Sequence, residues 1–129
     1  MARSSTSAPT WGWSGSTRTS RLPRADLVLR SAPGHTPGSS VLCLGSGSER
    51  AVFVGDMLHS PVQIWSPHAN SCFCENPKQA RGTRRRVLGE AADTRALVFP
   101  AHFPGHGAAQ IQREGDRFEI RSWAPLGRL

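Results

Sequence analysis

Short apolar runs alternate along this chain with clusters of glycine, proline and polar residues. Residues 26–30 (DLVLR), 39–44 (SSVLCL) and 51–54 (AVFV) have the length and composition of strands. Residues 96–99 (ALVF) form a further run of this kind, and residues 45–50 (GSGSER) are typical of a hairpin turn. The pattern therefore predicts buried strands, two of which form a hairpin.

A helix is predicted over residues 77–92, where apolar residues recur at helical spacing. Asn76 suits the N-cap of this helix, and Pro77 suits its first position. Residues 117–123 (RFEIRSW) alternate between apolar and polar side chains and predict a closing strand. Residues 56–75 show no periodicity and predict a long irregular segment. This order of elements predicts an α/β layered protein, with a helix that flanks a mixed sheet.

The length and composition are those of one small domain. The chain has 129 residues, of which 37% are hydrophobic and 19% are charged. No stretch approaches the ~20 apolar residues of a membrane-spanning helix, and no secretory signal is recognisable, so we expect a cytoplasmic protein without a membrane partner. Cys43, Cys72 and Cys74 are too few for a disulfide framework, and their spacing matches a zinc site only weakly, so we expect free thiols.

The net charge of +7 is concentrated at the N-terminus. Four of the 16 basic residues precede the first acidic residue, Asp26, so the remaining chain has 12 basic and 9 acidic residues. These four are Arg3, Arg18, Arg21 and Arg24. Residues 1–24 are rich in Ser, Thr and Arg without periodicity, so we expect a disordered tail, followed by one domain over residues 25–129.

The positive charge leaves a non-enzymatic interpretation open. In it, the chain is a small basic binding protein whose tail and Arg84–Arg86 contact nucleic acid or other anions. The three arginines span nearly one helical turn, so a solvent-facing helix surface is the simpler interpretation. No nucleic-acid-binding motif is recognisable, which disfavours nucleic acid as the partner. A non-catalytic remnant with a role in assembly is a third interpretation.

Three polar residues suited to metal binding follow predicted strands or lie in loops rich in glycine and proline. They are His35 in an APGHTPG loop, Asp56 after an AVFVG strand and His102 after an ALVFPA segment. Loops at strand ends are where α/β folds gather catalytic groups. Singly, each has an ordinary interpretation, such as a histidine bonded to backbone or an aspartate that caps a turn. Together they predict a site for zinc or another divalent metal.

Four segments resemble, in order and spacing, the C-terminal half of the metallo-β-lactamase-fold hydrolases. These segments are residues 32–39 (APGHTPGS), 53–59 (FVGDMLH), 76–92 and 100–104 (PAHFP). The Val62–Gln63 pair after the GD motif, together with GD at 115–116 and WAP at 123–125, is similar to the methyl parathion hydrolase-like branch. The resemblance covers about residues 26–125, which is most of the chain.

This resemblance implies part of an αβ/βα sandwich with a site for two metals, taken as zinc, at one edge of the sheets. By position, His35 resembles a ligand of the first metal, Asp56 the bridging carboxylate and His102 a ligand of the second metal. Metal-bound hydroxide would attack an ester, lactone or phosphoester of a small-molecule substrate. The resemblance implies no side-chain nucleophile.

Further candidates lie near these three residues. His59 follows Asp56 by three residues, and His106 lies in a loop rich in glycine and proline. We expect His59, Phe103 and His106 to line the substrate pocket or to support the ligands. Exposed loop positions are the alternative for both histidines. Cys74 stands where the related branch is expected to carry an acidic residue.

One part of the family pattern is missing. Family members carry an H-x-H-x-D-H motif before the GHTPG region, and it supplies further ligands to both metals. This chain has no histidine before His35 and no H-x-H anywhere, and the 34 residues before His35 are too few for the missing strands and motif. We therefore expect a truncated domain with one exposed apolar sheet face, whose partner would be the missing N-terminal half or a second copy. Activity of the chain alone stays an open question.

Overall fold

The computed structural model describes residues 17–22, 25–105 and 107–125, with side chains from residue 25 onward. The strands of this part of the chain form one sheet and follow one another in sequence order. They are β1 (Thr17–Leu22), β2 (Ala25–Ser31), β3 (Ser40–Ser46), β4 (Glu49–Gly55), β5 (Leu97–Pro100), β6 (Ala109–Glu114) and β7 (Arg117–Trp123). The helices are α1 (Val62–Trp65) and α2 (Pro77–Thr94).

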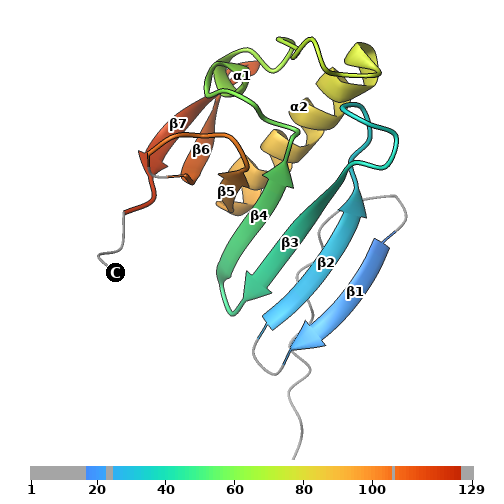
Figure 1. Cartoon of the computed structure of the whole chain (residues 1–129). Coiled ribbons are helices and arrows are strands. Elements are labelled where there is room, and N and C mark those ends of the chain that lie inside the picture. The colour runs from blue at the N-terminus through green and yellow to red at the C-terminus, as the bar shows by residue number, and fades with distance from the viewer. Residues whose placement is uncertain (1–16, 23–24, 106, 126–129) are drawn as a thin grey trace, which may run out of the picture.

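The sheet is mixed, because β4 and β5 run parallel while the other neighbouring strands are antiparallel. A parallel pair needs a crossover connection. Residues 56–96 supply it, and α2 within this connection lies against one face of the sheet (Figure 1). The predicted α/β fold class is confirmed.

Neither helix of the described residues has the length and apolar character that crossing a membrane requires.

The core lies between α2 and the side of the sheet that faces it. Val52 and Val54 of β4 and Val98 of β5 belong to one buried cluster with Val87 and Leu88 of α2. The two valines of β4 are separated by one outward-facing residue, as the two-residue period of a strand requires. The short apolar runs of the sequence are therefore the strands that support this core.

α2 begins at the residue that the sequence predicts. Asn76 Oδ1 accepts a hydrogen bond from the Gln79 N–H at 3.0 Å, and Pro77 occupies the first helical turn. The helix ends at Thr94, two residues beyond the predicted end, and Arg95 follows in the left-handed conformation with a φ of 55°. The predicted helix is confirmed, with a slightly longer C-terminal end.

The predicted strands at 26–30, 39–44, 51–54, 96–99 and 117–123 correspond to β2, β3, β4, β5 and β7. The prediction of a disordered tail over residues 1–24 is wrong for Thr17–Leu22, which form β1. β1 pairs with β2 along its whole length through backbone groups, and backbone pairing needs no apolar pattern. Residues 1–16, 23 and 24, which complete the predicted tail, lie outside the described residues.

Two further elements were not predicted from the sequence. β6 buries Ala109 and Ile111 and alternates them with partly exposed glutamines, so only two of its six side chains are apolar. α1 is a single helical turn inside the segment predicted to be irregular. Both elements are too short or too polar for periodicity alone to reveal them.

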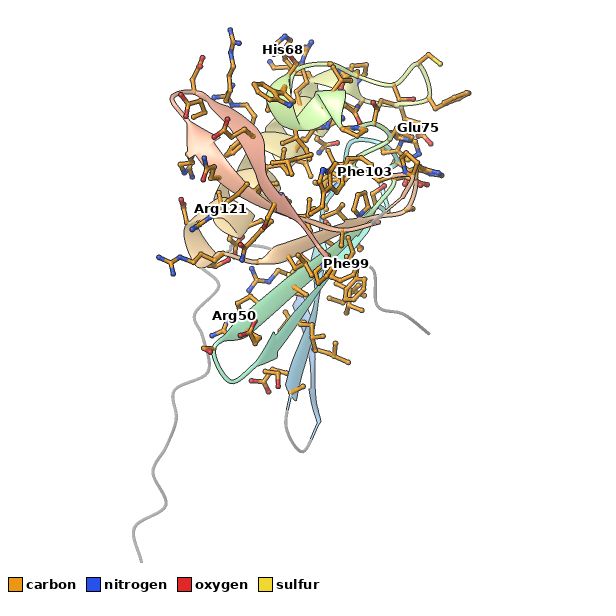
Figure 2. The ribbon with its side chains drawn as sticks, turned by 90° about the vertical axis from the view of Figure 1, so that its left-hand side faces the viewer. Arg50, His68, Glu75, Phe99, Phe103 and Arg121 are labelled. Carbon is orange, nitrogen blue, oxygen red and sulfur yellow. The ribbon has the colours of Figure 1, made fainter. Side chains whose placement is uncertain are left out.

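The face of the sheet turned away from α2 is apolar and partly exposed in the described part of the chain. Cross-strand register places two rows of side chains on it, because directly paired residues point to the same face. One row is Leu27, Leu44, Ala51 and Leu97, and the other is Leu29, Leu42, Phe53 and Phe99. The rings of Phe53 and Phe99 stack with centroids 4.7 Å apart, and Phe99 lies on the side away from α2 (Figure 2). The expectation of an exposed apolar sheet face is met at Leu29 and Phe53, which are 44% and 39% exposed, whereas the other members of the two rows are partly buried.

A buried ion pair joins α2 to the sheet. Arg30 Nη1 of β2 lies 2.9 Å from Glu90 Oε1 of α2, and only 5% of the Arg30 side chain is exposed. Each charge stabilises the other, because burial removes the water around a charge and only an opposite charge nearby offsets that loss. A contrasting pair, Arg113 with Asp93, lies at the surface with both side chains more than half exposed.

We predict that Glu90→Gln lowers the free energy of unfolding by about 3 kcal/mol, because it leaves the buried Arg30 charge without its carboxylate. Asp93→Asn, the matched change in the exposed pair, should cost less than about 1 kcal/mol. Urea denaturation followed by circular dichroism measures both. Equal losses in the two variants would show that the Arg30–Glu90 pair does not hold α2 on the sheet.

Candidate metal centre

The loop that carries His35 is fixed against the first turn of α2. Gly34 has a φ of 140° and lies so close to the helix that an added Cβ would come within 2.3 Å of the Ala80 backbone. The Gly34 carbonyl accepts a hydrogen bond from the Asn76 N–H, and the His35 carbonyl accepts one from the Glu75 N–H, each at 3.0 Å. Glycine is therefore required at this position, because no other residue fits both the conformation and the contact.

Asp56 and His102 are brought together by the parallel pairing of β4 and β5. Asp56 follows β4 and His102 follows β5 after Ala101, and parallel strands end at the same edge of a sheet. The Ala101 N–H donates to the Gly55 carbonyl at 3.3 Å, which extends the pairing toward the two side chains. Gly55 turns the chain out of the strand with a φ of 52°.

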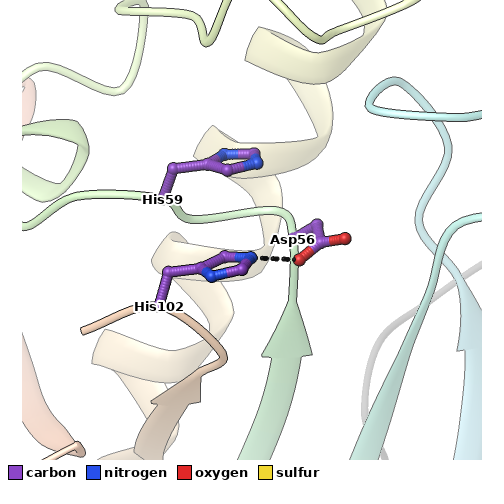
Figure 3. A group of neighbouring side chains, drawn as sticks. All are labelled: Asp56, His59 and His102. Carbon is purple, nitrogen blue, oxygen red and sulfur yellow. Dashed lines mark hydrogen bonds and ion pairs between the residues drawn. The ribbon is translucent and has the colours of Figure 1, made fainter. Parts of the chain in front are cut away.

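The carboxylate of Asp56 lies between two imidazoles. His102 Nε2 is 2.6 Å from Asp56 Oδ1, as Figure 3 shows, and His35 Nε2 is 3.7 Å from Asp56 Oδ2. The side chains of Asp56 and His102 are about half exposed, whereas that of His35 is 16% exposed. The structure thus brings together the three residues that the sequence singled out, with a different imidazole at each carboxylate oxygen.

His59 is the fourth member of this cluster. Its ring stacks almost parallel to the ring of His102, with centroids 5.4 Å apart, and lies 4.9 Å from the ring of His35. The Nδ1 atom of His59 is buried and has no hydrogen-bond partner among the described residues. Burial lowers the pKa of His59, and the neighbouring His35 lowers it further. The ring is therefore neutral near pH 7, which is the form that binds metals.

Gln63 at the start of α1 positions the segment that carries His59. Its Oε1 atom accepts hydrogen bonds from the backbone N–H groups of His59, at 2.6 Å, and Ser60, at 3.4 Å. Its Nε2 atom donates to the Ala69 carbonyl at 3.0 Å. The Gln63 side chain is buried, so one amide ties both ends of this loop together.

Arg84 corrects the prediction that Arg84–Arg86 form a solvent-facing surface. Its side chain is only 1% exposed, whereas Arg85 and Arg86 are exposed. The guanidinium donates to three backbone carbonyls of the loop between β4 and α2, which are those of Met57 at 3.1 Å, Pro67 at 2.6 Å and Ala69 at 2.9 Å. The three arginines therefore do not form one basic patch, because only Arg85 and Arg86 face solvent.

The helical spacing of apolar residues indicates that Arg84 is buried, although its charge favours an exposed position. Ala80, Arg84 and Leu88 follow one another at four-residue spacing, so Arg84 lies in the apolar stripe of the helix. A charged residue inside such a stripe indicates a buried group with polar partners. Those partners come from a distant irregular segment and could not be named from the sequence.

Cys74 lies behind His35. Its sulfur is 3.9 Å from His35 Nδ1, and the side chain is buried beside the Arg84 guanidinium. The cysteine thus occupies the position from which a polar group would orient the ring of His35. All three cysteines are free, as predicted; Cys43 is also buried, and burial raises the pKa of its thiol to about 11.

Of two residues predicted to line the pocket, one is buried in the hydrophobic core and the other lies outside the described residues. Phe103 is 8% exposed and belongs to the hydrophobic core, with its ring 6.3 Å from that of Trp123 in an edge-on arrangement. It therefore packs beneath the His102 loop, and its contribution to a substrate pocket stays a prediction. His106 lies outside the described residues.

The donor set of the cluster fits a divalent metal. Asp56, His59 and His102 each offer a ligand atom, and these three atoms lie within 4.8 Å of one another. Imidazole nitrogen and carboxylate oxygen are the donors of zinc sites in proteins. The buried and unpartnered Nδ1 of His59 adds a polar atom that the protein itself leaves unsatisfied.

We predict that Gly34→Ala lowers the free energy of unfolding by about 3 kcal/mol, because the new methyl group meets the Ala80 backbone and the residue keeps a positive φ. Gly38→Ala is the control in the same loop, since a Cβ there meets nothing within 4 Å. Denaturant midpoints of the two variants provide the comparison. A Gly34→Ala protein as stable as Gly38→Ala would contradict the packing of this loop on α2.

We predict that Arg84→Met costs about 3 kcal/mol of stability, because it leaves several buried carbonyl groups without a donor. Arg85→Met, one residue along the same helix, should change stability by less than about 0.5 kcal/mol because that side chain is exposed. Thermal melting of both variants tests the difference. Similar melting temperatures would mean that water replaces the guanidinium at little cost.

Comparisons with known proteins identify the family and the fold of the chain. The family model of the Metallo-beta-lactamase superfamily matches residues 24–118. AidC, described as a dizinc quorum-quenching lactonase, is 28% identical with a TM-score of 0.70, over 85% of this chain and 36% of its own. The hydrolase AbOPH of the beta lactamase superfamily is 26% identical with a TM-score of 0.69, over 80% of this chain and 35% of its own.

A probable metal-dependent hydrolase from Staphylococcus aureus shares the fold at 16% identity and a TM-score of 0.68, over 87% of this chain and 39% of its own. Among curated protein sequences, none matches the chain at a significant level. The chain thus spans little more than a third of the solved structures that it resembles. With a family model that covers most of its length, the chain belongs to the metallo-beta-lactamase superfamily.

Proposed function

We propose that this chain carries part of the active site of a metal-dependent hydrolase that cleaves a lactone, ester or phosphoester. The observation that supports the proposal is the Asp56 carboxylate, held between the imidazoles of His35 and His102 at the adjacent ends of β4 and β5. A carboxylate with an imidazole at each oxygen suits a pair of divalent metals.

His35, Asp56 and His102 are the residues that would hold the metal, with zinc proposed from their donor atoms. When bound, a divalent metal polarises a substrate oxygen and lowers the pKa of its bound water toward neutrality. The protein contributes the positions of the ligands, which are fixed by the Gly34 loop and by the pairing of β4 with β5. Asp56 and His102 are about half exposed, so water and a small substrate have access from solvent.

Lactones are the substrates to test first. A lactonase is among the similar solved structures, at 28% identity.

We propose, in addition, that the chain belongs to the methyl parathion hydrolase-like branch. This finer assignment is supported by the buried Gln63, which follows the GD motif and ties the His59 segment to Ala69.

The partner that we propose is a second layer of β-structure over the open sheet face. The two apolar rows on this face include Phe53 and Phe99, which lie on the strands that lead to Asp56 and His102. Covering these rows would remove apolar surface from water at about 25 cal/mol per Å². The layer would come from the rest of a longer protein or from a second copy of the chain, and it would bring further ligands to the same edge.

The proposal is tested with purified protein, zinc and three substrates: an N-acyl-homoserine lactone, an aryl ester and an aryl phosphotriester. We expect hydrolysis of at least one substrate, which a chelator abolishes and zinc restores. Asp56→Asn should lower the rate at least about 100-fold because it removes the charge between the two imidazoles. Asp93→Asn, which changes an exposed carboxylate of α2, should leave the rate unchanged.

The concentration dependence of this rate separates the possible partners. If a second copy covers the open face, the rate per molecule rises with protein concentration, and Phe53→Ser weakens that rise because it removes part of an apolar row. Absence of zinc-dependent hydrolysis at every concentration, or equal rates for the wild type and Asp56→Asn, would contradict the proposed function.

A further inference from the structure

We infer that His59 is a metal ligand of this chain, and that it holds a single divalent ion together with Asp56 and His102. The inference rests on the proposed function, because it assumes that a metal binds at this edge of the sheet. It goes beyond the resemblance, which implies His35, Asp56 and His102 as ligands and gives His59 a supporting place.

The first support is the distance between donor atoms. One ligand atom each from Asp56, His59 and His102 lies within 4.8 Å of the other two. Ligands bound tetrahedrally to zinc at about 2.0–2.1 Å lie roughly 3.3 Å apart, so shifts on the order of 1 Å would bring the three donors around one ion. Asp56 Oδ1 and His102 Nε2 are already 2.6 Å apart, with a hydrogen bond where the ion would bind.

The second support is the unsatisfied nitrogen of His59. Its Nδ1 atom is buried without a partner among the described residues, although a buried polar atom without a hydrogen bond typically costs about 1–3 kcal/mol. A ring that served only for packing would be replaced at lower cost by an apolar side chain. Figure 3 shows the His59 ring stacked above the His102 ring, and the His59 ring also lies 4.9 Å from that of His35, so it belongs to the cluster.

The third support is the way in which the ring is held. The His59 N–H donates to Gln63 Oε1 at 2.6 Å, which fixes the backbone, and the ring stacks on His102 at an interplanar angle of 7°. Ligand side chains are commonly oriented in advance by such contacts. His35 contacts the other carboxylate oxygen, at 3.7 Å, so it does not compete for the same position.

The resulting set of two imidazoles and one carboxylate leaves room for a further ligand. Catalytic zinc sites typically have three protein ligands and an open fourth position. Asp56 and His102 are half exposed, which leaves that position accessible from solvent. This chain should therefore bind one ion by itself, without the ligands that other family members take from the H-x-H-x-D-H motif.

Cobalt(II) titration of the purified chain, followed by calorimetry and visible absorption, tests the inference. We expect one ion per chain for the wild type. His59→Phe keeps a stacking ring but removes both nitrogens, and it should weaken binding at least about tenfold. His68→Phe is the matched control, because His68 is an exposed histidine of the same segment (Figure 2) and should bind as the wild type does.

His59→Cys provides a second test that does not depend on lost stability. A cysteine ligand at this position should restore binding and add a sulfur-to-cobalt charge-transfer band that the wild type lacks. If His59→Phe binds within twofold of the wild type and His59→Cys adds no band, His59 is not a ligand and the inference fails while the proposed function stands. If the wild type itself binds no ion, the proposed function fails with it; binding without hydrolysis would overturn only the proposed function.

Discussion

The long segment between β4 and α2 carries His59 to the sheet edge. It also buries backbone carbonyl groups that accept no hydrogen bond within a strand or helix. Buried backbone groups need partners, and the Arg84 guanidinium provides them for Met57, Pro67 and Ala69. One side chain thus supplies the hydrogen bonds that a neighbouring strand or helix would otherwise supply to these carbonyl groups. Because Met57 follows Asp56 directly, the same hydrogen bonds that fold the segment also limit where the candidate ligands can move.

α2 contacts two of the chain segments that supply the site, and it is also tied to β2 of the sheet. Its first two turns receive the His35 loop, where Gly34 lies against Ala80 and Thr83 Oγ1 donates to the Pro33 carbonyl at 2.6 Å. Its second turn also carries Arg84, which holds the His59 segment, and its fourth turn carries Glu90, which binds Arg30 of β2. The order of these contacts along one helix explains how residues far apart in sequence reach one sheet edge. Stability of the helix and geometry of the site are therefore coupled.

The sequence was sufficient for the parts of the structure that follow from local patterns. Four apolar runs and one alternating segment predicted five strands, and the Asn76–Pro77 pair predicted the start of α2. Loops and strand ends predicted that His35, Asp56 and His102 would meet. It was insufficient where the partner is distant or is backbone alone. β1 pairs through its backbone, and the burial of Arg84 depends on carbonyl groups of a segment without periodicity. Periodicity records which face of an element is buried, but not which groups satisfy the polar atoms on that face.

The two faces of β4 connect the apolar sheet face with the candidate site. Val52 and Val54 point toward α2 and are buried, whereas Phe53 between them points to the open face and is 39% exposed. The strand then ends at Asp56, which is itself half exposed. Any layer that covers Phe53 must therefore pass within a few residues of the carboxylate. The proposed second layer would therefore cover the apolar rows and enclose the candidate site together, because both lie along the same strand.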